Sequence, residues 1–274
     1  MVPDRAGFLR PRKSLGQNFL VDKNTARKII RAVRPERSDV FVEIGPGQGS
    51  LTEHLEGNVR HLVAVEIDPR AVEKLSLRFT TGSVEIICQD FLQFDLKSTA
   101  RNHGTTVRVL GNIPYNITSP ILFHILSSRS SVKDATLMVQ REVGQRIVAG
   151  PGSKEYGIPS VLSQYYASVS RLFDVPPTVF VPRPEVWSSV IQLTPYARPP
   201  FPARDEEFFR LMVRATFGQR RKMLRHSLRS FLGTQPPEVG DQFDLRRRPE
   251  DLSVGELVEL SNLLYDRRTI VKGL

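Results

Sequence analysis

The segment Asn112-Ile113-Pro114-Tyr115 combines a planar amide, a backbone stiffened by proline and an aromatic ring. It directly follows TVRVLG, an apolar run typical of a strand. The amide oxygen of Asn112 and the carbonyl oxygen of Ile113, aimed by the fixed φ of Pro114, can each accept a hydrogen bond. Tyr115 offers a face on which a flat base can stack. The alternative interpretation is a turn that ends a strand, with Tyr115 in the core.

An exocyclic amino group on adenine is a substrate that suits these residues. Its lone pair is delocalised into the ring, so the nitrogen must become pyramidal before it can attack a methyl group. Two acceptors on its two N–H groups favour that geometry and bind the developing ammonium better than the amine. No ionised base is needed, which is consistent with Asn rather than Asp at position 112. A base that leaves its stack is held between aromatic faces, and Phe180, on the proline-rich loop FVPRPEV (180–186), is the candidate for the second face. Packing is the alternative role for Phe180.

A glycine-rich turn, EIGPGQG, lies where an earlier predicted strand gives way to a helix. Gly45 and Gly47 would let backbone N–H groups approach a ligand closely at the carboxyl edge of a sheet. Glu66 ends the next strand, where a carboxylate can accept both hydrogen bonds of a ribose diol, and Asp90 ends the third, where it can accept from an adenine amino group. The dinucleotide pattern G-x-G-x-x-G is out of register here. The sequence therefore favours S-adenosylmethionine over NAD.

The elements that position these residues alternate between strand and helix. A helix is expected over DKNTARKIIRAV, with Asp22 as its cap. Strands separated by helices predict an α/β fold with a parallel, doubly wound, Rossmann-like sheet. The expected strands are residues 39–45, 61–68, 83–90, 106–112 and 135–140, with a further helix running into a strand over 161–175.

The character of the chain changes at the proline-rich segment 194–207. We expect a cofactor-binding domain with a basic N-terminal arm over residues 1–200 and a smaller all-helical, RNA-binding domain over 201–274. A helix through 217–232 would bury Phe217, Leu224, Leu228 and Phe231 on one face. Basic side chains beside that face would meet phosphates, and the run 214–229 contains no acid. The residues expected to bind RNA are Arg220, Arg221, Lys222, Arg225 and Arg229.

Composition limits the class of protein. The 274 residues carry a net charge of +10, which favours a polyanionic partner such as nucleic acid, although an anionic membrane surface would also fit. With one cysteine and no histidine spacing of a metal site, we expect no disulfide and no metal. No apolar run is long enough to span a membrane and no signal peptide is recognisable. We expect a soluble, cytoplasmic protein, and a trimmed organellar transit peptide is an open alternative.

Several blocks occur in one order along the chain and resemble the KsgA family of ribosomal RNA adenine dimethyltransferases. They are KSLGQNFL (13–20), VEIGPGQGSLT (42–52), GNIPYNITSPIL (111–122), FVPRPEVWSSV (180–190) and FGQRRKMLRHSL (217–228). The resemblance implies that Asn18 and Leu20 contact the cofactor, together with Gly45, Glu66, Asp90 and Asn112. It also implies that residues 112–115 and Phe180 embrace the target base.

The resemblance further implies the substrate, two adjacent adenines in the hairpin loop near the 3′ end of small-subunit (16S) rRNA, each methylated twice. The expected partner is the pre-30S ribosomal particle, bound by a monomer. Two alternatives stay open: an Erm-type enzyme acting on large-subunit rRNA, and a non-catalytic nucleic-acid-binding or assembly factor built on a methyltransferase fold. Trp187 departs from the family, which has a small or polar residue there, and packing is its expected role.

Overall fold

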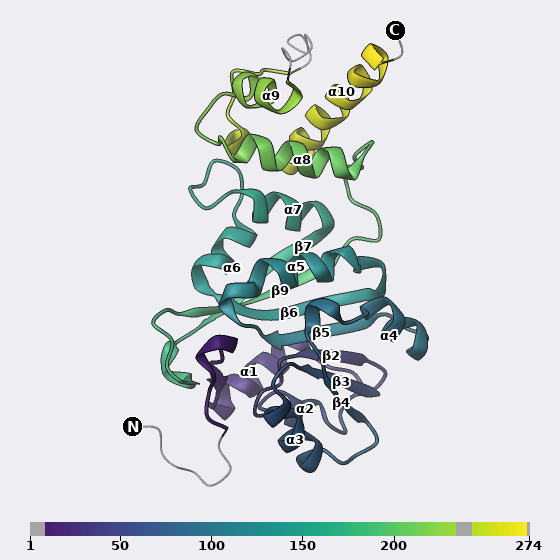
Figure 1. Cartoon of the computed structure of the whole chain (residues 1–274), viewed down its shortest axis with the longest axis vertical. Helices are drawn as coiled ribbons and strands as arrows, with labels where there is room; N and C mark the ends of the chain where they lie inside the picture. The colour runs from purple at the N-terminus through teal and green to yellow at the C-terminus, as the bar shows by residue number, and fades with distance from the viewer. Residues whose placement is uncertain (1–8, 234–242, 273–274) are drawn as a thin grey trace. The chain divides into compact units, whose positions relative to one another are not determined.

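The structure is a computed structural model that describes residues 9–233 and 243–272, with side chains as far as residue 267 (Figure 1). The first eight residues of the predicted basic arm lie outside the described residues. By its contacts the chain divides into two compact units. Unit 1 comprises residues 1–144 and 169–195, and unit 2 comprises residues 145–168 and 196–274.

Unit 1 is built on a seven-stranded sheet in the order β4-β3-β2-β5-β6-β9-β7. Strands β4, β3, β2, β5 and β6 run parallel, and β9 is antiparallel to β6. A separate two-stranded antiparallel sheet joins β1 to β8. The strands are β1 Phe19–Leu20, β2 Val40–Ile44, β3 His61–Glu66, β4 Val84–Cys88, β5 Val107–Asn112, β6 Val132–Gln140, β7 Ala167–Val175, β8 Phe180–Val181 and β9 Ser188–Pro195.

The helices follow the strands in the alternation that the sequence predicts. Asp22 caps α1, accepting a hydrogen bond from the Thr25 N–H at 2.6 Å, and Pro69 opens α3 after its cap Asp68. The helices are α1 Lys23–Val33, α2 Thr52–Leu55, α3 Pro69–Arg78, α4 Leu96–His103, α5 Thr118–Ser127, α6 Arg141–Val148, α7 Ile158–Tyr166, α8 Glu206–Phe217, α9 Leu224–Leu232 and α10 Val254–Lys272.

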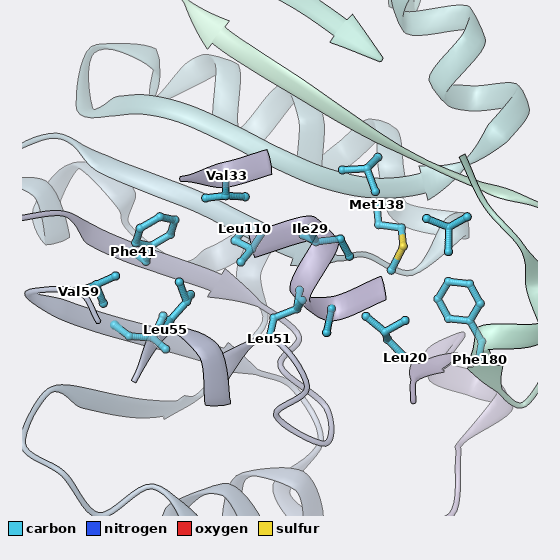
Figure 2. Close-up of a cluster of buried hydrophobic side chains, with 14 residues drawn as sticks. Leu20, Ile29, Val33, Phe41, Leu51, Leu55, Val59, Leu110, Met138 and Phe180 are labelled. Atoms are coloured by element: carbon cyan, nitrogen blue, oxygen red, sulfur yellow. The ribbon is translucent and has the colours of Figure 1, made fainter. Parts of the chain in front are cut away.

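The central strands are buried on both faces, which explains their nearly unbroken apolar sequences. All residues of β2 are buried, as expected for a parallel strand covered by helices on both sides. On one face, α1 contributes Ala26, Ile29 and Val33 to a core cluster with Phe41 of β2 and Leu110 of β5 (Figure 2). This cluster fixes the strands whose carboxyl ends carry the predicted site.

Two local predictions fail. The sheet is mixed rather than wholly parallel, because β9 returns beside β6 in the antiparallel direction. The expected helix over 217–232 is interrupted: α8 ends at Phe217, and α9 begins only at Leu224. Between them Met223 is extended, with φ −61° and ψ 150°, and the Leu224 N–H is bonded to the Arg247 carbonyl at 2.9 Å. This long-range backbone hydrogen bond therefore takes the place of the intrahelical bond that would continue the helix.

In its described residues unit 2 is mainly helical: it contains the end of α6, the helices α7 to α10 and the first two residues of β7. The four apolar residues of the 217–232 segment still pack inward: Phe217, Leu224 and Leu228 are buried, and the Phe231 ring lies 5.4 Å from that of Phe208. The contact-based division groups residues 145–168 with the C-terminal helices, whereas we expected the boundary near residue 200. None of the described helices is long and apolar enough to cross a membrane.

Candidate active site

A cavity opens at the carboxyl ends of β2, β3, β4 and β5 in unit 1, the edge at which open α/β sheets bind ligands. It measures about 760 Å³ including its open mouth. Nine of the residues selected from the sequence line it: Asn18, Gly45, Gly47, Glu66, Asp90, Asn112, Ile113, Pro114 and Tyr115. The structure therefore brings together residues that are up to 97 positions apart in the sequence.

The glycine turn forms one wall of the cavity. Gly45 and Gly47 have φ of 58° and 59°, in the left-handed region where a side chain is strained. A Cβ at Gly47 would lie 2.8 Å from Cδ1 of Phe19, so the turn leaves no room for one. Gly47 is therefore required for the close approach of this backbone to Phe19, whereas Gly45 is favoured by its φ alone, since a Cβ there would have no atom within 4 Å.

Glu66 is held in place from two sides. Its Oε2 accepts the Gly47 N–H and its Oε1 accepts the Asp68 N–H, each at 3.0 Å. Burial raises the pKa of this carboxyl, and the backbone hydrogen bonds act against that rise. The Ile67 N–H adds a further backbone hydrogen bond, and the carboxylate, with about four acceptor sites, keeps capacity to accept from a ligand hydroxyl.

Asp90 lines the cavity directly after β4. Its Oδ1 accepts the Leu92 N–H at 2.9 Å and caps the short helix Phe91–Gln93. Among the described residues no hydrogen bond to its Oδ2 is found. One oxygen is thus structural, and the other is available to a ligand.

Asn112 has a defined amide orientation. Its Nδ2 donates to the carbonyl oxygen of Asn18 at 2.8 Å. Since a carbonyl oxygen can only accept, the NH₂ group must face Asn18, and Oδ1 is the remaining acceptor. The N-terminal segment thereby fixes the amide of the strand-ending asparagine.

Beside it, the Ile113–Tyr115 corner supplies a second acceptor and a ring. Within the described chain no donor bonds to the Ile113 carbonyl, whereas the next carbonyl, of Pro114, accepts the Ile117 N–H at 3.3 Å. The Tyr115 hydroxyl shares a hydrogen bond of 2.7 Å with that of Ser188 in β9, which anchors the ring. Burial raises the pKa of Tyr115, so the phenol stays neutral.

Leu20 and Phe180 are not brought into the cavity. They pair with each other between β1 and β8, are 4% and 2% exposed, and belong to the core cluster of α1 (Figure 2). The Leu20 carbonyl accepts the Ser50 hydroxyl. Their contacts with cofactor and base remain predictions, and Phe180 would have to leave the core cluster to meet a base.

The structure adds site residues that the sequence did not single out. Gln17, inside the GQNFL block, lines the cavity and donates from Nε2 to Oδ2 of Asp68 at 3.1 Å. Phe91 also lines the cavity, next to Asp90. Glu43 of β2 is buried behind the glycine turn and accepts the Thr52 hydroxyl at 2.7 Å, and burial raises its pKa to about 7. The position of Glu43, one residue before the end of a strand, is the sequence feature that could have identified it as a site residue.

The predicted RNA-binding residues lie in unit 2 and differ in their surroundings. Arg220 is engaged: its Nε bonds to Glu250 at 2.6 Å and its guanidinium to the Lys154 carbonyl at 2.9 Å. Arg221, Lys222 and Arg229 are exposed and pair with no acid in the described part of the chain. Arg225 is exposed and contacts His226. Four of the five are thus presented to solvent.

The fold and this site define the class of Rossmann-like methyltransferases that act with S-adenosylmethionine. The profile of the family described as ribosomal RNA adenine dimethylase matches residues 9–265. The chain belongs to this family, as the resemblance predicts.

Similarity to known proteins extends over nearly the whole chain. The ribosomal RNA small subunit methyltransferase A of Chromohalobacter salexigens is 42% identical over 255 residues, 92% of this chain and 90% of that protein. The protein of the same name from Pseudomonas aeruginosa is 41% identical, covering 94% and 96%. A dimethyladenosine transferase from Plasmodium falciparum has the same fold, with a TM-score of 0.76 at 22% identity over 91% and 98% of the two chains. The 23S rRNA methyltransferase ErmE also shares the fold, with a TM-score of 0.64 at 24% identity over 88% and 100%.

Proposed function

We propose that this chain transfers methyl groups from S-adenosylmethionine to the exocyclic amino groups of two adjacent adenines in the 3′-terminal hairpin loop of small-subunit rRNA. The names of the bacterial relatives and the family match support this substrate. The observation that carries the reaction is the amide of Asn112, whose orientation by the Asn18 carbonyl leaves an acceptor beside the cavity.

The cavity suits a nucleoside cofactor without pyrophosphate. Glu66 would hold the ribose diol and Asp90 the adenine amino group, while the backbone of Gly45 and Gly47 would lie against the remainder. When bound, S-adenosylmethionine supplies an electrophilic methyl group on a sulfonium.

Residues 112–115 would prepare the target amine. Oδ1 of Asn112 and the carbonyl of Ile113 accept from its two N–H groups, which turns the lone pair out of conjugation. Tyr115, anchored on Ser188, stacks on the base. Both acceptors strengthen as positive charge develops on nitrogen, so they stabilise the transition state more than the bound substrate.

The exposed basic residues of α9 and the preceding turn would bind phosphates of the rRNA. We further propose that the partner is the pre-30S particle and that the protein acts in the cytoplasm as a monomer. The first test is transfer of labelled methyl groups from S-adenosylmethionine to unmethylated small and large ribosomal subunits, with mass spectrometry of the rRNA. Dimethyladenosines in the small-subunit 3′ hairpin are expected. Label in the large subunit alone would contradict the substrate, and RNA binding without label would indicate a binding factor.

Replacing Glu66 by Gln should weaken cofactor binding by roughly 10- to 100-fold, because the diol loses charge-assisted hydrogen bonds worth about 1.5–3 kcal/mol. Isothermal titration with S-adenosylmethionine and with S-adenosylhomocysteine measures the effect. Glu85→Gln, on the exposed neighbouring strand β4, is the matched control and should bind normally. Equal affinities of the two variants would remove Glu66 from the cofactor site.

Neutralising Arg221 and Arg225 together to Gln should weaken binding of the small subunit and flatten its salt dependence by roughly two in log–log slope. Cofactor affinity should not change. The control is the pair Arg204→Gln and Arg210→Gln, two arginines that already contact acidic partners. Filter binding over a range of KCl concentrations measures the salt dependence of small-subunit binding. Parallel salt slopes for the two double variants would refute the assignment of Arg221 and Arg225 to the RNA-binding surface.

A further inference from the structure

Trp187 is the only tryptophan of the chain, and it is not a core residue. It lies immediately before β9, and 44% of its surface is exposed, as is 44% of the neighbouring Val186. An exposed indole ring offers a face on which a flat base can stack. The packing role expected from the sequence does not account for this exposure of the Trp187 side chain.

Arg141 fixes the position of this tryptophan. As the first residue of α6 it donates its backbone N–H to the Trp187 carbonyl at 2.9 Å, and its guanidinium carbon lies 5.8 Å from the centre of the indole ring. This is a cation–π distance. The ring is therefore held by its neighbour while much of its surface faces solvent, with a positive charge beside it.

The position of the pair relative to the candidate active site follows from the strand. Ser188, the next residue, carries the hydroxyl that bonds to Tyr115. Trp187 directly precedes the first residue of β9, and its ring lies beside Arg141 at the start of α6. It borders the same rim of the sheet as Tyr115, because Ser188 pairs with Gln140 at the carboxyl end of β6.

We propose that Trp187 and Arg141 form a stacking site for the nucleotide next to the target adenine in a single-stranded RNA loop. Arg141 is positioned for the adjoining phosphate. The ligand is a nucleotide of single-stranded RNA, because stacking on an exposed indole needs only the π face that every base has. This inference rests on the proposed function, since it assigns a flanking nucleotide to the same site.

The single tryptophan gives a direct test. Hexa-adenylate RNA should quench its fluorescence at saturation, because a stacked base contacts the indole. Binding of labelled hexa-adenylate, followed by anisotropy, should be roughly 10- to 100-fold weaker for Trp187→Leu and nearly unchanged for Trp187→Phe, which keeps an aromatic face. With small subunits as substrate, Trp187→Leu should raise KM by a similar factor and leave kcat within about twofold.

Phe201→Leu is the matched control, since Phe201 is also an exposed aromatic, 53% exposed in unit 2, and should bind hexa-adenylate like the wild type. Absent quenching, or equal affinities of Trp187→Leu and wild type, would overturn the inference while methylation by the wild type left the proposed function intact. If the wild type methylates no small subunit, the proposed function fails, and quenching by hexa-adenylate still decides the stacking site.

Discussion

Replacement of Asn112 by Ala is expected to reduce kcat for adenine methylation by about 10²–10³, the usual loss when one preorganised transition-state hydrogen bond is removed. The amide is held by the Asn18 carbonyl at 2.8 Å, so its oxygen needs no reorganisation before it accepts the amine. Single-turnover transfer to unmethylated small subunits, with rRNA binding measured in parallel, tests this expectation. Binding of the subunit should remain within a few-fold of wild type.

Two further variants sharpen the test. Asn112→Asp keeps the shape but cannot donate to the Asn18 carbonyl, so a carboxylate oxygen would face a carbonyl oxygen; we expect it to be impaired as well. Asn58→Ala removes an exposed asparagine whose amide also donates to a backbone carbonyl, that of His54 at 3.1 Å, and should methylate normally. Full activity of Asn112→Ala would mean that another group aligns the amine.

Much of the candidate site can be predicted from the sequence, because the ends of the strands that carry it can be predicted. Parallel strands place their carboxyl ends at one edge of the sheet. Correct strand boundaries were therefore enough to predict that one site contains Gly45, Glu66, Asp90 and Asn112. The family and the fold class predicted from the motifs are confirmed. Local periodicity and caps were sufficient for α1 and α3, whose capping residues are as expected.

The remaining features depend on partners distant in the sequence. Nothing local shows that Phe180 pairs with Leu20 inside the core, or that Glu250 engages Arg220. The break between α8 and α9 is set by the Arg247 carbonyl, which has no signature in residues 217–232. The antiparallel return of β9 likewise depends on its register with β6. Motifs identify the chemistry of these residues, but the fold decides which of them are free to perform it.

The opposite end of β5 carries a charged network that the sequence analysis does not predict. Arg108 is 5% exposed; it contacts Asp39 at 2.7 Å and Asp134 at 2.9 Å, and donates to the carbonyls of Val33 and Arg34 that end α1. Burial acts to raise the pKa of Asp39, but hydrogen bonds from Arg108, from the Glu36 N–H and from Lys133 outweigh it, so this pKa lies below its ordinary value.

Arg108→Met should lower the free energy of unfolding of unit 1 by about 3–5 kcal/mol at pH 7, because it leaves two buried carboxylates without their shared cation. Stability contributed by a carboxyl with a lowered folded pKa is present above its unfolded pKa and is lost as pH falls through the folded value. The difference between wild type and variant should therefore be largest near neutral pH and shrink below about pH 4. Urea unfolding followed by Trp187 fluorescence at pH 7 and at about pH 2.5, well below the ordinary pKa of an aspartate, measures both. Arg171→Met, which removes an exposed pair with Asp174, should cost less than about 1 kcal/mol at either pH. A loss for Arg108→Met that is equally large at both pH values would show that packing of the Arg108 side chain, and not its charge, stabilises this end of the sheet.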